Sequence, residues 1–362
     1  MKTYCKGLAV DEAMVMRAYE KWSRSDAGRK NAWRIEGEHG SPEALVGEIA
    51  QEIRHRNLAL RPIHRYRYRE PTNGKVRVIG VESVKQQVCD YVAVEALAPL
   101  LAAKVGFWQV ASVPGKGQGM AARTARRWVQ EGGYHVHLDV RRCYPSIKAS
   151  AVMRVLDKYV RSPDVLYLCG ALLATYDGGL EIGSYFSLRM AQLLLSFAYH
   201  EVEGMGKRRR GAWRPLVAHQ LWYADDVFLF GKDKRDLRMA ARKLAGYMHS
   251  RFDLAVKPWK VCKTGNVEPV DCVGYTVRPG RTTLRTSLFL RLRRAFSRFR
   301  HRPCLRLARR VASYWGWLKH SDSRGFVARN HVKRTMDKAK ALLGAYERRI
   351  ANGGYDTIRN AA

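Results

Sequence analysis

Apolar and polar residues in the N-terminal part of the chain follow first a helical and then a strand-like period. Residues 11–25 and 41–56 place apolar side chains at helical spacing, which predicts two amphipathic helices. Residues 63–79 alternate with a period of two around Pro-Thr-Asn-Gly at 71–74, which predicts a β-hairpin with two basic arms. Residues 82–104 return to the helical period and are expected to form one helix.

The central part of the chain contains two strand-like segments that carry acidic residues. Residues 134–139 alternate apolar and polar side chains, as a half-buried strand does, and Asp139 is the last of them. Residues 221–230 (LWYADDVFLF) are two apolar arms around Asp225 and Asp226. Because the arms require burial and the carboxylates do not, this segment predicts a hairpin with both aspartates at its tip. Further helices are expected at 120–131, 151–160, 187–201 and 234–251, and short strands at 254–256 and 272–277.

Basic residues dominate the composition. The 362 residues include 66 Lys and Arg against 32 Asp and Glu, a formal net charge of +34, which favours a polyanionic partner. The charge is spread over every segment and interleaved with 9 Trp and 18 Tyr, so nucleic acid is favoured over a membrane surface. On charge alone, a ribosome-associated basic protein is the alternative. Residues 285–350 hold 19 Lys and Arg against 3 acidic residues, and we expect a domain boundary near residue 283.

Cysteine spacing and hydropathy indicate the compartment. The seven cysteines show no zinc-binding spacing, which predicts reduced thiols. The N-terminus lacks a secretory signal, and the most apolar window, residues 91–108, is interrupted by Glu95, Pro99 and Lys104. We therefore expect a cytoplasmic protein that does not contact a membrane. The glycine-rich loop at 112–119 lacks the spacing of a P-loop, which argues against an NTPase.

The three aspartates predict a site for divalent metal ions. Asp225 and Asp226 concentrate negative charge at a hairpin tip in a strongly basic chain, and Asp139 supplies a carboxylate from a second strand. Two Mg²⁺ ions about 3.5–4 Å apart are bridged by such carboxylates, activate an attacking hydroxyl and stabilise a leaving pyrophosphate. An ordinary turn is the alternative, since aspartate is common in turns.

The order of these motifs resembles that of the bacterial reverse transcriptases related to group II intron enzymes. The resemblance covers about residues 60–320 and consists of seven sequence blocks in register. The blocks are GKVRVIGVES with Arg77, SVPGKGQG at 112–119, LDVRRCYPSI with Asp139, GGLEIGSYFSLRMAQ, LWYADD, VKPWKV with Lys260, and VGY. The basic helices after residue 285 are similar to the thumb of these enzymes.

The resemblance implies an α+β, right-hand polymerase fold. Fingers and palm would combine antiparallel sheet with helices, and the thumb would be helical and basic. The implied domains are a helical N-terminal extension at 1–60, fingers at 61–133, a palm at 134–283 and a thumb and tail at 284–362.

The resemblance also assigns roles to individual residues. Asp139, Asp225 and Asp226 would be the catalytic metal ligands, holding two Mg²⁺ ions for which Mn²⁺ can substitute. Nucleotide contacts would come from Lys75 and Arg77 (triphosphate), Tyr144 (clash with a 2′-hydroxyl), Ile182 (where retroviral enzymes have glutamine) and Lys260 (proton donor to pyrophosphate). Nucleic acid would contact Lys116, Arg291, Arg294, Arg298, Arg309 and Arg310. For Lys75 a solvated surface charge, for Tyr144 core packing and for Lys260 a solvated charge are the alternatives.

The resemblance implies an RNA-templated DNA polymerase that uses dNTPs, with template RNA and cDNA product as partners. Ile182, where retroviral enzymes have glutamine, is a departure that resembles the error-prone enzymes of diversity-generating retroelements. Leu188, where glutamine is usual, suits a divergent branch such as the reverse transcriptases of bacterial antiviral defence. A retroelement enzyme would act with a small basic accessory protein and a structured template RNA, and a defence enzyme with a structured noncoding RNA. A reverse transcriptase of bacterial antiviral defence and a non-catalytic RNA-binding relative are the alternatives. Tyr144 argues against an RNA-templated RNA polymerase.

Overall fold

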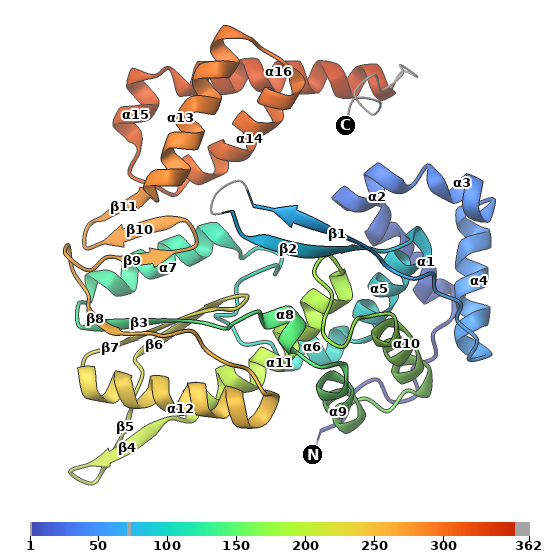
Figure 1. The fold of residues 1–362 in the computed structure, drawn as a ribbon, viewed down its shortest axis with the longest axis horizontal. Helices are drawn as coiled ribbons and strands as arrows, with labels where there is room; N and C mark the ends of the chain where they lie inside the picture. The colour runs from blue at the N-terminus through green and yellow to red at the C-terminus, as the bar shows by residue number, and fades with distance from the viewer. Residues whose placement is uncertain (1, 71–73, 352–362) are drawn as a thin grey trace. The chain divides into compact units, whose positions relative to one another are not determined.

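The computed structural model describes residues 2–70 and 74–351 and has an α+β fold with antiparallel sheets (Figure 1). Residues 71–73 of the predicted turn and 352–362 of the predicted tail lie outside the described residues. The chain divides into two compact units, and each draws on separate stretches of sequence. Unit 1 contains Met1–Gln109, His137–Leu229 and Arg235–Lys260, and unit 2 contains Val110–Val136, Phe230–Lys234 and Val261–Ala362.

The N-terminal helices of unit 1 follow the predicted pattern. Ser41 caps α4, with the Ala44 amide donating to its hydroxyl oxygen at 3.1 Å, and Pro42 begins the helix. α1 packs against α4 and α5 through an apolar face that includes the fully buried Trp22. The four helices before the first strand are α1 (Glu12–Ser23), α2 (Asp26–Asn31), α3 (Arg34–His39) and α4 (Pro42–Arg54).

The remaining helices of unit 1 correct one prediction. Residues 82–104 form two helices, α5 (Val84–Ala96) and α6 (Ala98–Lys104), because Pro99 in the first turn of α6 has no amide hydrogen to continue the ladder of α5. The others are α8 (Cys143–Ser146), α9 (Ala149–Tyr159), α10 (Pro163–Ala174), α11 (Tyr185–Gly204) and α12 (Lys234–Phe252), whose first residue belongs to unit 2.

The strands of unit 1 confirm both predicted hairpins. β1 (His64–Arg69) pairs antiparallel with β2 (Val76–Val81), with Tyr66 opposite Ile79. β6 (His219–Tyr223) and β7 (Asp226–Gly231) are neighbours joined by two residues, and β7 also neighbours β3 (Tyr134–Asp139). The last two residues of β7 and the first three of β3 belong to unit 2. An exposed hairpin of β4 (Gly206–Arg209) and β5 (Ala212–Pro215) is an addition. The strand predicted at 254–256 is reduced to one isolated bridge between Val256 and Val140.

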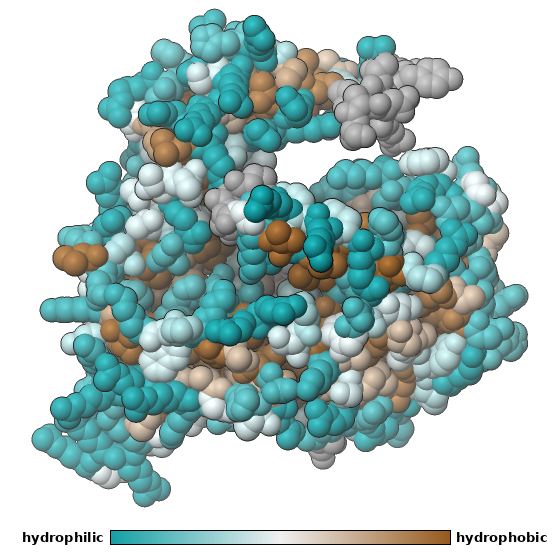
Figure 2. All heavy atoms as spheres, in the orientation of Figure 1, coloured by the Kyte–Doolittle hydropathy of each residue, from teal (hydrophilic) through white to brown (hydrophobic). Residues whose placement is uncertain are grey.

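Apolar side chains from the β6–β7 hairpin form part of the core of unit 1. Leu221, Trp222, Val227 and Phe228 are at most 1% exposed. The burial of these side chains anchors the arms of the β6–β7 hairpin, and the residues at its tip keep partial access to solvent. By contrast, Figure 2 shows mainly hydrophilic residues on the visible surface of β4 and β5.

Unit 2 combines one helix, short strands and a basic helical group. β9 (Val270–Cys272), β10 (Tyr275–Arg278) and β11 (Arg281–Leu284) form an antiparallel sheet, against which α7 (Gln118–Gln130) packs. The strand predicted at 272–277 is therefore interrupted, because Val273 and Gly274 have positive φ and turn the chain. The other elements are β8 (Val261–Lys263), α13 (Thr286–His301), α14 (Leu305–Lys319), α15 (Arg324–Arg329) and α16 (Val332–Ala351).

Two observations concern the expected compartment. Within the described ranges 2–70 and 74–351, the model contains no helix with the length and hydrophobicity needed to cross a bilayer. All seven cysteines, each within the described residues, are thiols outside any disulfide, and five of them are buried.

Candidate active site

The three predicted aspartates lie at the ends of neighbouring strands. Asp139 ends β3, Asp225 lies in the turn that leads to β7, and Asp226 begins β7, the strand next to β3. The Val140 amide donates to the Asp225 carbonyl oxygen at 3.2 Å, which fixes the turn beside the end of β3. The turn requires a positive φ of 53° at Ala224, a conformation that costs free energy in a residue other than glycine. All three belong to unit 1.

Electrostatic coupling shows that the carboxylates are within reach of one another. Burial raises the pKa of Asp225, the negative charges of Asp226 and Asp139 raise it further, and the guanidinium of Arg77 opposes them. Burial likewise raises the pKa of the Cys143 thiol, and the negative charges of Asp225 and Asp139 raise it further. The site therefore concentrates negative charge that is only partly neutralised by its neighbours.

Two side-chain partners of the aspartates, a lysine and a histidine, were not predicted from the sequence. The Lys257 ammonium contacts Asp139 Oδ2 at 2.5 Å, and its backbone amide donates to the Asp139 carbonyl oxygen at 2.9 Å. His137 Nε2 lies 2.7 Å from Asp226 Oδ1, and its ring stacks on Phe228. The sequence held one signal for His137, because residues two apart on a strand share a face and His137 precedes Asp139 by two.

The carboxylates fit magnesium by the chemistry of their oxygen donors. Mg²⁺ prefers carboxylate oxygens and keeps places for water and phosphate, and the repulsion expressed at Asp225 is the kind that a cation relieves. Lys257 contacts one carboxylate oxygen of Asp139, and His137 contacts one carboxylate oxygen of Asp226. Among residues 2–70 and 74–351, no group of three or more His, Cys, Asp or Glu side chains is already arranged to hold a metal ion.

Arg77 and Tyr144 lie within electrostatic reach of Asp225. Arg77, on β2, forms an ion pair with Glu70, and its charge lowers the pKa of Asp225. Tyr144 lies in α8. Burial raises the pKa of its hydroxyl, and the charges of Cys143 and Asp225 raise it further. The structure therefore brings these two predicted nucleotide contacts together with the aspartates.

The other predicted nucleotide contacts lie on neighbouring segments. The Ile182 carbonyl oxygen accepts the Gly80 amide at 2.8 Å, which joins the loop before α11 to β2. Lys75 is exposed just before β2, and its carbonyl oxygen accepts the Glu70 amide at 2.8 Å. Lys260 is exposed three residues after Lys257, which is the lysine whose ammonium contacts Asp139.

A buried acidic pair joins the segments that carry Arg77 and Ile182. Glu82 follows β2 and is 5% exposed, and Asp90 on α5 is fully buried. Asp90 Oδ2 accepts the Ser184 hydroxyl at 2.7 Å and the Phe186 amide at 2.8 Å, which holds the first turn of α11. Burial raises the pKa of both carboxyl groups, and the charge of Asp90 raises that of Glu82 further.

The predicted nucleic-acid contacts belong to unit 2. The arginines at 291, 294 and 298 recur at helical spacing on α13, opposite the buried Leu292 and Phe296. Arg309 and Arg310 are exposed on α14, and the Arg309 guanidinium lies 5.2 Å from the centre of the Tyr346 ring. Lys116 lies in the loop before α7, where burial lowers its pKa.

Comparison with known proteins adds no relative. No protein-family model and no curated protein matches the sequence.

Proposed function

We propose that this protein is an RNA-templated DNA polymerase that resembles the bacterial group II intron-like reverse transcriptases, with a right-hand arrangement of fingers, palm and thumb. The observation that carries the proposal is the meeting of Asp139, at the end of β3, with Asp225 and Asp226 at the β6–β7 tip. An Asp-Asp turn that served only as a turn would need no third carboxylate coupled to it.

Asp139, Asp225 and Asp226 are the residues that would hold Mg²⁺, or Mn²⁺ in its place. Two bound Mg²⁺ ions supply activation of a primer 3′-hydroxyl and stabilisation of the leaving pyrophosphate. Lys257 pairs with Asp139 and His137 contacts Asp226, and the ammonium charge would offset part of the repulsion among the carboxylates.

The surrounding side chains would bind and select the nucleotide. Arg77 carries a guanidinium whose geometry suits triphosphate oxygens, and Lys75 is a second cation on the same arm. Tyr144, near Asp225, offers a bulky ring that would exclude a 2′-hydroxyl. Ile182 offers no polar side-chain contact to the nucleotide, which supports low fidelity. Lys260 would act on pyrophosphate.

The basic helices of unit 2 would bind template and product. Exposed arginines on α13 and α14, together with Lys116, supply phosphate contacts that carry no sequence choice, so that binding weakens as salt increases. We place the enzyme in the cytoplasm.

For its biological setting we propose error-prone cDNA synthesis in a diversity-generating retroelement, with a small basic accessory protein or a structured noncoding RNA as partner. A reverse transcriptase of an antiviral-defence system is the second candidate, because the same blocks suit both. A non-catalytic RNA-binding relative is the third, and the contacts of Lys257 with Asp139 and of His137 with Asp226 favour it.

Primer extension on an RNA template, with dNTPs or NTPs, tests the proposal. Wild-type protein should extend with dNTPs, and Asp225→Asn should reduce extension at least about a thousand-fold by removing a carboxylate that would hold the metal ions. Asp157→Asn, an exposed position on α9, is the matched control and should retain activity. Equal extension by Asp225→Asn and wild type would refute the proposal. Tight RNA binding without extension by either protein would favour the RNA-binding relative.

A further inference from the structure

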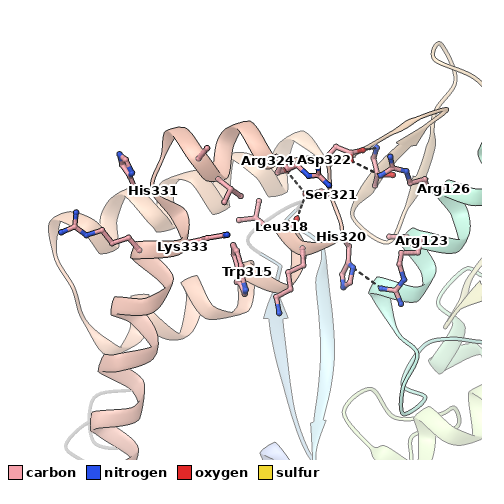
Figure 3. Close-up of a pocket in the computed structure, with 17 residues that line it drawn as sticks. Arg123, Arg126, Trp315, Leu318, His320, Ser321, Asp322, Arg324, His331 and Lys333 are labelled. Atoms are coloured by element: carbon pink, nitrogen blue, oxygen red, sulfur yellow. Dashed lines mark hydrogen bonds and ion pairs between the residues drawn. The ribbon is translucent and has the colours of Figure 1, made fainter.

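Unit 2 contains a large basic pocket that the proposed polymerase chemistry does not use. It has a volume of about 850 Å³ and lies between α7, Thr282 on β11 and the helices α14, α15 and α16 (Figure 3). This size is within the range of small-molecule and cofactor sites. None of the residues assigned above to metal, nucleotide or nucleic acid lines it.

Positive charge dominates the lining. Six Lys and Arg residues and two His residues line the pocket, against one acidic residue in the described part of the chain, Asp322. Asp322 is already engaged, because Arg126 Nη1 contacts its Oδ1 at 3.0 Å and the Thr282 amide donates to its Oδ2 at 2.7 Å. The pocket therefore favours an anion, whose charge would balance the excess of cations.

His320 lies in the positive field of this lining. Burial lowers its pKa, and the positive charges of Arg123 and Lys319 lower it further. Its Nδ1 lies 3.3 Å from the guanidinium of Arg123, and its ring lies so close to Gly119 that a side chain there would displace it.

Thr282 Oγ1 is buried without a hydrogen-bond partner among the described residues, which leaves one hydroxyl for a ligand.

The pocket wall also provides an aromatic surface. Trp315 is half-buried and lines the pocket with Leu318 and Val327, and Figure 3 shows Trp315 and Lys333 in the same part of the site. Aromatic rings stack on nucleobases while cations bind the flanking phosphates. An acidic peptide would use the cations and leave the aromatic wall without a matching group.

We propose that this pocket binds one nucleotide unit, with its base against Trp315 and its phosphates against the basic lining. The unit belongs to a single-stranded nucleic acid or to a free nucleotide, which share this chemistry. The inference rests on the proposed function for the kind of polymer at hand, but it does not depend on the three aspartates.

Fluorescence anisotropy with a labelled twelve-nucleotide RNA, in EDTA and across a salt series, tests the proposal. EDTA prevents extension, so the outcome is independent of catalysis. Lys319→Gln/Lys333→Gln should lower the slope of log affinity against log salt by about 1 for each phosphate that the protein no longer neutralises. Lys338→Gln/Lys340→Gln removes the same charge from exposed positions of α16 outside the pocket and should change the slope less. Equal effects of the two pairs would overturn the proposal.

The aromatic part of the proposal has its own variants. Trp315→Ala should weaken RNA binding roughly ten-fold, and Trp315→Phe should restore most of the affinity because it keeps a stacking surface. Equal affinity of the alanine variant, wild type and the phenylalanine variant would overturn the assignment of Trp315. Circular dichroism of each variant confirms that unit 2 is folded.

Competition identifies the source of the nucleotide. Displacement of the labelled RNA by ATP from wild type, but not from the pocket variants, supports a free nucleotide. Displacement by unlabelled RNA alone supports a strand. Equally strong displacement by polyglutamate would overturn the nucleotide in favour of an acidic peptide. Primer extension with the pocket variants keeps a failure here distinct from a failure of the polymerase proposal.

Discussion

Replacing Glu82 by Gln should stabilise the protein, and increasingly so as pH rises. The carboxyl group is buried against Asp90, and burial followed by the charge of Asp90 raises its pKa from 4.5 to about 9. At pH 7 the folded protein thus keeps Glu82 protonated, whereas the unfolded chain ionises it. Folding takes up a proton, so this residue lowers stability progressively as pH rises from the unfolded pKa toward the folded one.

The size of the effect follows from the pKa shift. Each pKa unit corresponds to about 1.4 kcal/mol, and pH 7 lies 2.5 units above the unfolded pKa of 4.5, so the wild-type residue opposes folding by at most about 3.5 kcal/mol at pH 7. A neutral amide of the same shape removes the linked proton and can donate a hydrogen bond to Asp90. The difference in unfolding free energy between Glu82→Gln and wild type should be small near pH 4.5 and grow by about 1.4 kcal/mol per pH unit up to pH 8.

Urea unfolding followed by circular dichroism between pH 5 and pH 8 measures this difference. Glu36→Gln, at an exposed position of α3, is the control and should show no comparable growth with pH. The reasoning is refuted if Glu82→Gln and wild type differ by the same amount at pH 5 and pH 8, because Glu82 would then ionise equally in the folded and unfolded chains.

Two further substitutions test the packing of the loop before α11 on β2 and the role of the Tyr144 ring. Gly183→Ala should cost about 1–3 kcal/mol in urea unfolding, because φ is +117° and the new Cβ would collide with the Gly80 carbonyl oxygen. Gly178→Ala, also at positive φ but with open space around it, is the control and should cost less. Tyr144→Ala should increase NTP incorporation relative to dNTP at least about ten-fold in primer extension, while Tyr144→Phe should not. Unchanged discrimination in the alanine variant would remove the role of the ring.

Sequence alone predicted the elements that carry the aspartates because their patterns are local. Alternation over 134–139 identifies β3 and its end at Asp139, and the apolar arms around Asp225 identify the β6–β7 hairpin. The β4–β5 hairpin was missed because its arms bury almost nothing and show no alternation of apolar and polar positions. Local patterns therefore indicate elements best where burial requires them.

Local sequence patterns do not predict side-chain contacts between residues that are distant in the sequence. Lys257 meets Asp139 across 118 positions, and nothing in VKPWKV distinguishes it from Lys260 before the chain folds. Glu82 and Asp90 read as surface charges by composition, and only tertiary packing buries them. The number and kind of charges were visible in the sequence, but the pairs they form were not.

The contacts of Lys257 with Asp139 and of His137 with Asp226 imply that metal binding at the proposed site would replace existing side-chain contacts. A carboxylate cluster with a lysine and a histidine against it would remain assembled without a divalent ion, and an ion that took the Asp139 oxygen contacted by Lys257 would displace the ammonium group. The ammonium group displaced in that way would then be available to pair with a polyphosphate. Loading of metal and capture of substrate would thus be linked through a single lysine.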